Sequence, residues 1–140
     1  MKRTELADQL HDKKYNCCQA VLCAWADKTG VDTQTLFRVG EGFGLGMGCM
    51  DGTCGALSGA IALAGLDNSD GDLNAPKTKA STMKLSREML ALFQERCGGT
   101  ICRDLKGVDT GKMLTSCQDC IRIACEIAGE VLYPEDNGEI

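Results

Sequence analysis

The sequence predicts an all-α fold, a small single-domain bundle of about five to seven helices with a glycine-rich loop. The chain has 140 residues, the length of one domain. It holds only two prolines, and few segments alternate polar with β-branched residues as strands do. Apolar residues recur instead at helical spacing. We expect residues 1–140 to form one domain that ends in a frayed tail, residues 134–140.

Three helices are expected before the glycine-rich loop. The first is short and amphipathic and spans about residues 3–12. The second begins after Asn16, a good N-cap, with Gln19 three positions later in a capping-box pattern. It stops by Gly30, because glycine is common just past a helix end. A brief helix over residues 33–39 follows.

The glycine-rich loop covers residues 40–55, where seven of sixteen positions are glycine. This density indicates unusual backbone angles, or a close approach of the backbone to another group. Backbone N–H groups near Gly46, Gly48 and Gly55 are therefore candidates to contact a cofactor. Residues 55–66 follow as a helix of small residues, which favours close packing against a neighbouring helix.

Three further helical segments are expected in the second half of the chain. A long helix runs over about residues 76–97, since proline is tolerated in a first turn. One short turn follows over residues 101–106, with Thr100 as its expected N-cap. The last helix runs over residues 117–132, with Ser116 as its N-cap.

Composition excludes several classes of function. The formal net charge is −5 and the acidic groups are scattered, which argues against a nucleic-acid partner. No apolar run reaches the 18 residues typical of a membrane-spanning helix. His11 is the only histidine, so histidine-rich zinc sites and histidine-based triads are not expected unless His11 itself serves. The first residues lack the apolar segment of a signal peptide, so we expect a cytoplasmic protein with reduced thiols.

Four of the ten cysteines stand at the expected helix starts. A helix N-terminus carries partial positive charge and unpaired N–H groups, and both favour a thiolate over a thiol. Thiolates bind metals and attack disulfides. If the helix starts converge, their sulfurs would face one site. The four candidate ligands are Cys17, Cys54, Cys102 and Cys117.

The other cysteines divide into two groups. Cys120 completes a C-x-x-C motif with Cys117, and Cys49 lies between two methionines, so both are additional candidate metal ligands. The remainder lie within helices or near a helix end, where a buried cysteine commonly fills the core. These core candidates are Cys18, Cys23, Cys97 and Cys125.

Three segments and one further cysteine carry a resemblance to a known family. The segments are Asn-Cys-Cys-Gln-Ala-Val at 16–21, Cys-Gly-Ala-Leu-Ser-Gly-Ala at 54–60 and Gly-Thr-Ile-Cys-Arg-Asp-Leu at 99–105, followed by Cys117. The chain resembles the C_GCAxxG_C_C family of redox-active proteins over nearly its whole length. The resemblance implies redox activity and a cysteine set of Cys17, Cys54, Cys102 and Cys117. A similar module in split-Soret cytochromes implies iron–sulfur or electron-transfer chemistry. No haem is expected, because this chain lacks a Cys-x-x-Cys-His motif.

Three functions remain open from the sequence, and it does not decide whether the protein is an enzyme. The first is an iron–sulfur cluster for electron transfer, with structural zinc as a less favoured variant. The second is a thiol–disulfide protein in which Cys54 is the nucleophile and Cys102, among other candidates, the resolving cysteine. The third is a non-catalytic helical module, with the small-residue helix as an oligomer face. The expected partner is a redox protein or a small sulfur compound.

Overall fold

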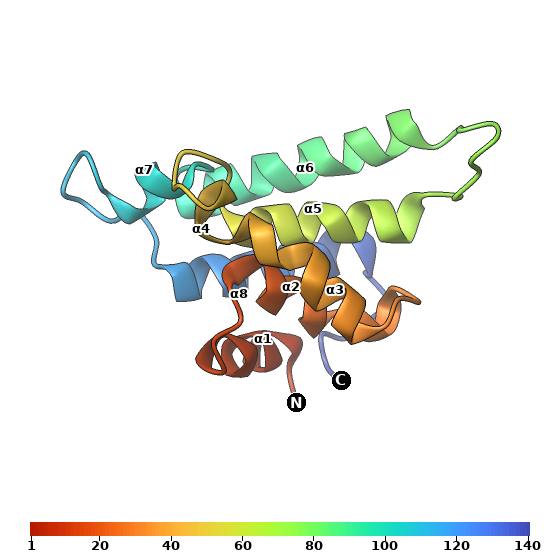
Figure 1. The fold of residues 1–140 in the computed structure, drawn as a ribbon, viewed down its shortest axis with the longest axis horizontal. Coiled ribbons are helices and arrows are strands. Elements are labelled where there is room, and N and C mark those ends of the chain that lie inside the picture. The colour runs from red at the N-terminus through yellow and green to blue at the C-terminus, as the bar shows by residue number, and fades with distance from the viewer.

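The computed structural model describes residues 1–140 and confirms the all-α class. It has seven regular helices, a four-residue turn labelled α4, two 3-10 helices and no strand (Figure 1). None of the helices combines the length and the apolar character needed to cross a membrane. The elements in chain order are α1 (Arg3–Asp12), α2 (Cys17–Ala24), η1 (Ala26–Lys28), α3 (Thr33–Gly40), η2 (Glu41–Phe43), α4 (Gly44–Met47), α5 (Gly55–Asn68), α6 (Lys79–Cys97), α7 (Cys102–Lys106) and α8 (Cys117–Leu132).

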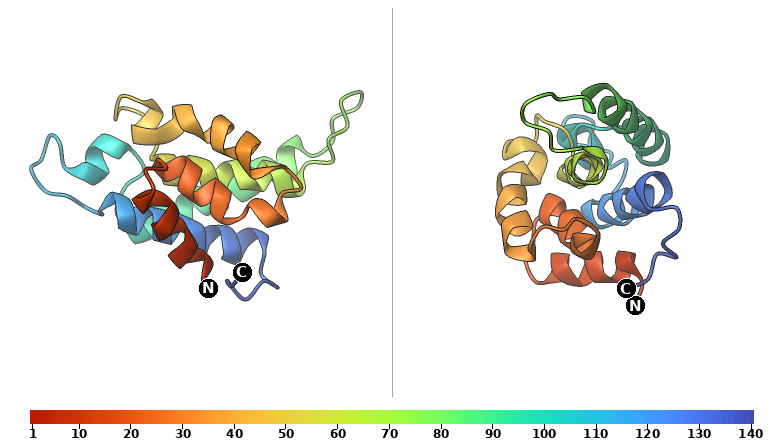
Figure 2. Two further views of the ribbon diagram at one scale, coloured as in Figure 1. Left: turned by 60° about the horizontal axis from the view of Figure 1, so that its bottom comes forward. Right: turned by 90° about the vertical axis from the view of Figure 1, so that its right-hand side faces the viewer.

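The small-residue helix α5 lies at the centre, with α2, α6 and α8 packed around it (Figure 2). Its buried side chains include several alanines, which fill little space and keep the neighbouring backbones close. Gly59 marks the closest approach, because a Cβ there would lie 2.9 Å from the carbonyl oxygen of Cys18 on α2. Helix α2 can therefore lie this close to α5 only because residue 59 has no side chain.

Two helix starts differ from the sequence prediction. Helix α6 begins at Lys79 rather than near residue 76, and in the segment before it the N–H groups of Asp72 and Asn74 bond to aspartate side chains in tight turns. Helix α7 begins after Ile101, so Thr100 is not its N-cap. The carbonyl of Thr100 accepts the N–H of Cys54, and this long-range bond holds Thr100 outside the helix. Helix α2 also ends early, at Ala24.

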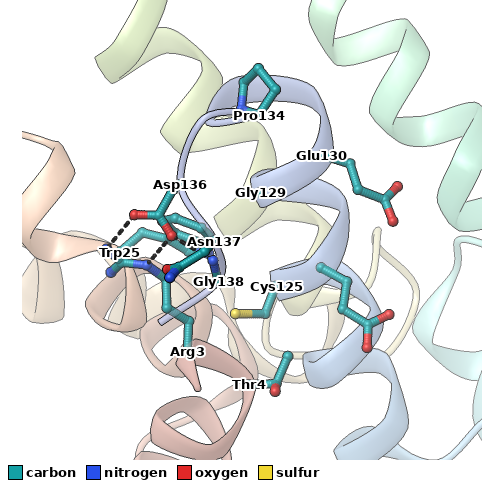
Figure 3. Close-up of a pocket in the computed structure, with 11 residues that line it drawn as sticks. Arg3, Thr4, Trp25, Cys125, Gly129, Glu130, Pro134, Asp136, Asn137 and Gly138 are labelled. Atoms are coloured by element: carbon teal, nitrogen blue, oxygen red, sulfur yellow. Dashed lines mark hydrogen bonds and ion pairs between the residues drawn. The ribbon is translucent and has the colours of Figure 1, made fainter. Parts of the chain in front are cut away.

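Residues 134–140, which the sequence predicts to be a frayed tail, lie against the N-terminal segment (Figure 3). The Arg3 guanidinium is 2% exposed and pairs with Asp27 and with Asp136, the latter at 3.0 Å. It also lies 4.2 Å from the centre of the Trp25 ring. A backbone N–H of Ile140 donates to the carbonyl of Met1 at 2.9 Å. These contacts connect residues 134–140 to the N-terminal segment, and they include a carboxylate partner for a buried cation.

Substitution of Gly59 and of Gly65, two of the three glycines of α5, should have opposite effects. Gly59→Ala is expected to lower the free energy of unfolding by about 1–3 kcal/mol, because the methyl group would push α2 from α5. Gly65→Ala is the matched control, since a Cβ there meets nothing within 4 Å. It should raise the free energy of unfolding by up to about 1 kcal/mol. Urea unfolding of both variants checks this, and equal effects would contradict the packing argument.

Candidate functional site

The predicted cysteines meet at one cavity of about 230 Å³. The N-terminal ends of α2, α5, α7 and α8 all contribute a cysteine to its wall, and the second cysteine of the C-x-x-C motif joins them. The start of α7 and the turn α4 lie together at the left of Figure 1. The cavity lining comprises Cys17, Cys54, Cys102, Cys117 and Cys120, together with His11, Asn16, Leu45, Leu105, Lys106 and Thr115.

Capping residues place two of these cysteines in the first turns of their helices. The Asn16 side chain accepts the N–H of Gln19 at 2.9 Å and donates to the Glu41 carbonyl at 2.9 Å. It therefore fixes the start of α2 against the end of α3. The Ser116 hydroxyl accepts the N–H of Asp119 at 3.1 Å at the start of α8. Cys17 and Cys117 follow these caps directly, as the sequence predicted.

Backbone hydrogen bonds bring the other two helix starts together. The N–H of Cys54 donates to the Thr100 carbonyl at 2.7 Å, just before α7. In return, the N–H of Cys102 donates to the Gly52 carbonyl at 3.0 Å. The N–H of Arg103 donates to the carbonyl of Met50 at 2.8 Å. The glycine-rich loop thus joins the start of α5 to the start of α7.

Two of the three predicted cofactor-contacting glycines lie against cavity cysteines instead of lining the cavity. A Cβ on Gly55 would collide with the Cys17 sulfur, and one on Gly46 would collide with the Cys102 Cβ. Gly48 has open space around it and contacts none of these groups. None of the three lines the cavity. Gly46 and Gly55 therefore make room for the sulfurs.

Cys54 is the centre of a chain of sulfur contacts. Hydrogen bonds from the Cys120 and Cys17 thiols hold the pKa of Cys54 well below its usual value, although burial opposes this shift. The N–H groups of Ala56 and Leu57, in the first turn of α5, lower it further. The same contacts with Cys54 raise the pKa of Cys17 and the pKa of Cys120. The cluster therefore favours one thiolate, Cys54, between two protonated thiols.

Lys106 is the cation of this cavity. Its ammonium group bonds to the Cys117 sulfur, which raises the pKa of Lys106, and the nearby Cys102 and Cys17 act in the same direction. No carboxylate lines the cavity, and Lys106 takes part in none of the ion pairs of the chain. Its charge is therefore available to balance negative sulfur.

The remaining cysteines lie away from the cavity wall. Cys49 is exposed and its thiol contacts the Gly46 carbonyl at 3.8 Å. Cys97 is buried at the end of α6 and bonds to Cys120, so it extends the sulfur contacts into the core. Cys97 belongs to the buried core, as the sequence predicted, and so do the three remaining cysteines. These core cysteines are Cys18, Cys23 and Cys125.

The thiols of the chain are all free in this structure. No three histidine, cysteine or acidic side chains are gathered closely enough to hold a single metal ion. A zinc ion would need its thiolates within one coordination shell. The ligands of an iron–sulfur cluster are divided among its irons, so all four need not lie within one coordination shell. Four thiolates are the usual donor set of such a cluster, and the cavity wall holds four cysteines, from four helix starts, that could provide them.

The prediction missed several wall residues. Lys106 lies four positions after Cys102, so a helix over residues 102–106 would have placed both on one face. His11 and Leu45 carry no comparable signal, because the packing of α1 and the loop conformation bring them to the cavity. Thr115 precedes the cap of α8 and was also not foreseen.

Comparison with known proteins gives one match. The family model described as "Putative redox-active protein (C_GCAxxG_C_C)" matches residues 15–131. This range includes the four helix-start cysteines and Lys106. No curated protein and no solved structure matches the chain.

The lowered pKa of Cys54 predicts a thiolate that persists in mild acid. A depressed pKa keeps the charged form below the usual titration range, so the Cys54 thiolate should survive from about pH 8 down to pH 5. Cys97, whose pKa the Cys120 thiol also lowers, adds to the same absorbance. Thiolate ultraviolet absorbance during a pH titration measures this. Cys54→Ser should remove the Cys54 contribution to the acid-stable absorbance, and Cys49→Ser, the exposed control, should keep it. Loss of absorbance near pH 8 in the unsubstituted protein would contradict the assignment.

Proposed function

Because the chain belongs to the C_GCAxxG_C_C family of proteins described as redox-active, we propose that its cavity holds an iron–sulfur cluster. The proposed ligands are Cys17, Cys54, Cys102 and Cys117, and the proposed activity is transfer of single electrons to a redox partner. The observation that carries the proposal is that these four cysteines, from four helix starts, line one cavity. Cys120, in the same wall, is a reserve ligand, and Cys49 lies outside it.

The surroundings of the sulfurs support this proposal. The first turn of α5 directs the N–H groups of Ala56 and Leu57 at the Cys54 sulfur. The N–H of Leu45 bonds to the Cys17 sulfur, and Lys106 contacts Cys117. N–H groups and a cation stabilise negative sulfur, and they are the groups by which proteins set a cluster's potential. When bound, a cluster would supply a one-electron couple, and these groups would hold the added charge.

The arrangement of the sulfurs also fits two ligand pairs. Cys17 and Cys54 are in direct contact. Cys102 and Cys117 share the neighbouring cation Lys106. Each pair joins two helix starts, so the set draws on all four helices. A reducing compartment such as the cytoplasm would keep these thiols free to bind iron.

Anaerobic purification should give a brown protein that contains iron and acid-labile sulfide. Replacement of Cys54, Cys102 or Cys117 by serine should weaken iron binding at least about tenfold, because a ligand is lost. Cys49→Ser is the matched control and should leave the iron content unchanged. Elemental analysis and visible absorbance measure the outcome. A colourless protein that takes up no iron or sulfide on anaerobic reconstitution would refute the cluster proposal.

A second candidate function is thiol–disulfide exchange at the same cysteines. The contacts of Cys54 favour it, because a stabilised thiolate lies between two thiols. The Cys54 thiolate would attack a small disulfide, form a mixed disulfide and release one thiol. Cys17 or Cys120 would then lose its proton, attack the Cys54 sulfur and release the second thiol. The chain would be oxidised by two electrons and the small disulfide reduced to two thiols. Cys102, the partner proposed from sequence, is not among the hydrogen-bonding contacts of Cys54.

This second candidate predicts a specific disulfide. Reaction of the reduced protein with an excess of a small disulfide should give Cys54 bonded to Cys17 or to Cys120, detected by peptide mass spectrometry. Cys54→Ser should slow the exchange at least about a hundredfold, because the stabilised thiolate that begins the reaction is lost. Cys49→Ser should exchange at the normal rate. Oxidation confined to Cys49, with Cys54 still reduced, would refute this function.

A further inference from the structure

The glycine-rich loop contains residues other than glycine in the left-handed conformation. Leu45, Met47 and Met50 have φ values of 56°, 63° and 69°. A side chain makes this region unfavourable, and glycine adopts it freely. Glycine already stands at positions 46 and 48 of the same turn. Leucine at position 45 therefore needs a reason beyond the path of the chain.

Leu45 makes two contacts with the cavity. Leu45 lines the cavity and is 47% exposed, so it borders both the cavity and solvent. Its backbone N–H bonds to the Cys17 sulfur. Both contacts come from one backbone geometry, which the N–H of Met50 holds by donating to the Leu45 carbonyl at 2.8 Å. Neither Met47 nor Met50 lines the cavity.

We propose that Leu45 is a positioning residue that closes the cavity over its cysteines. The left-handed backbone conformation places the Leu45 side chain over the sulfurs, and the Leu45 backbone N–H holds the Cys17 sulfur. The closed wall excludes bulky thiol reagents and oxidants but leaves the cavity open to small ones. This role rests on the proposed function for its purpose, which is to protect a thiolate redox centre. The closure itself is a property of the free thiols and does not require iron.

The test measures access to the cavity thiols in the reduced protein. Cys17 and Cys54 are labelled at one pH with a small alkylating reagent and with a bulky maleimide, and peptides are counted by mass spectrometry. The ratio of bulky to small labelling cancels differences in thiolate content. It should rise at least about fivefold in Leu45→Gly, because the wall is open without a local unfolding step. Leu45→Met should restore the original ratio.

Two controls separate closure from loss of structure. Met47→Gly relieves a left-handed residue of equal exposure outside the cavity, so its ratio should match that of the unsubstituted protein. Leu45→Gly should melt no lower than the unsubstituted protein, because glycine suits the backbone. Labelling of the core thiol Cys125 should stay unchanged. An unchanged ratio in Leu45→Gly, an equal rise in Met47→Gly, or a parallel rise at Cys125 would each overturn the proposal. Failure of iron binding would refute the cluster alone.

Discussion

Four helices direct their N-terminal ends at one small cavity. Each end carries a partial positive charge, and the rest of the site depends on which groups balance that charge. Unpaired N–H groups at a buried helix end need acceptors, and neighbouring positive ends repel one another. Carboxylates would meet this need, yet none lines the cavity. Sulfur takes their place. The Cys54 sulfur accepts N–H groups from α5 and thiols from two other helices, so one negative atom joins three elements.

Glycine is what allows so many chain segments to meet around these sulfurs. Gly55 lies against the Cys17 sulfur, and Gly46 against the Cys102 side chain. Gly59 serves the same purpose deeper in the bundle, where α5 meets α2. At the cavity and in the helix packing alike, the chain segments come close together where glycine leaves no side chain between them. This accounts for several of the glycines immediately before and within α5, although not for Gly48 and Gly65, where a Cβ would meet nothing.

Local signals predicted most of the helices and the placement of the cysteines. Asn16 and Ser116 are visible caps, so the starts of α2 and α8 were correct. The start of α7 shifted by one position because the Thr100 carbonyl bonds to Cys54, far away in the chain. The pairing of Arg3 with Asp136 was not foreseen for a similar reason, since these residues lie at opposite ends of the chain. Periodicity and capping describe short segments and carry no record of such pairs.

The contacts among the sulfurs could not be read from the chain. The sequence placed four cysteines at helix starts, but it did not show which of them touch. Cys54 contacts Cys17 and Cys120 rather than Cys102, because the relative rotation of α2, α5 and α8 decides the pairing. Lys106 was within reach of a simple spacing argument from Cys102. His11 and Leu45 depend on the packing of α1 and on a left-handed turn, which helical spacing does not describe.

The contact between the two chain ends has a consequence for how this domain can be handled. Met1 and Ile140 are joined by a backbone hydrogen bond, and Arg3 fastens the tail beside them. Because the two ends lie side by side, they could be joined and the chain opened at another point, as in a circular permutant. The exposed segment between α5 and α6 projects at the right of Figure 1, away from α4 and α7. A permuted chain opened there, with its present ends linked, would keep the cavity intact and could be inserted into a loop of another protein.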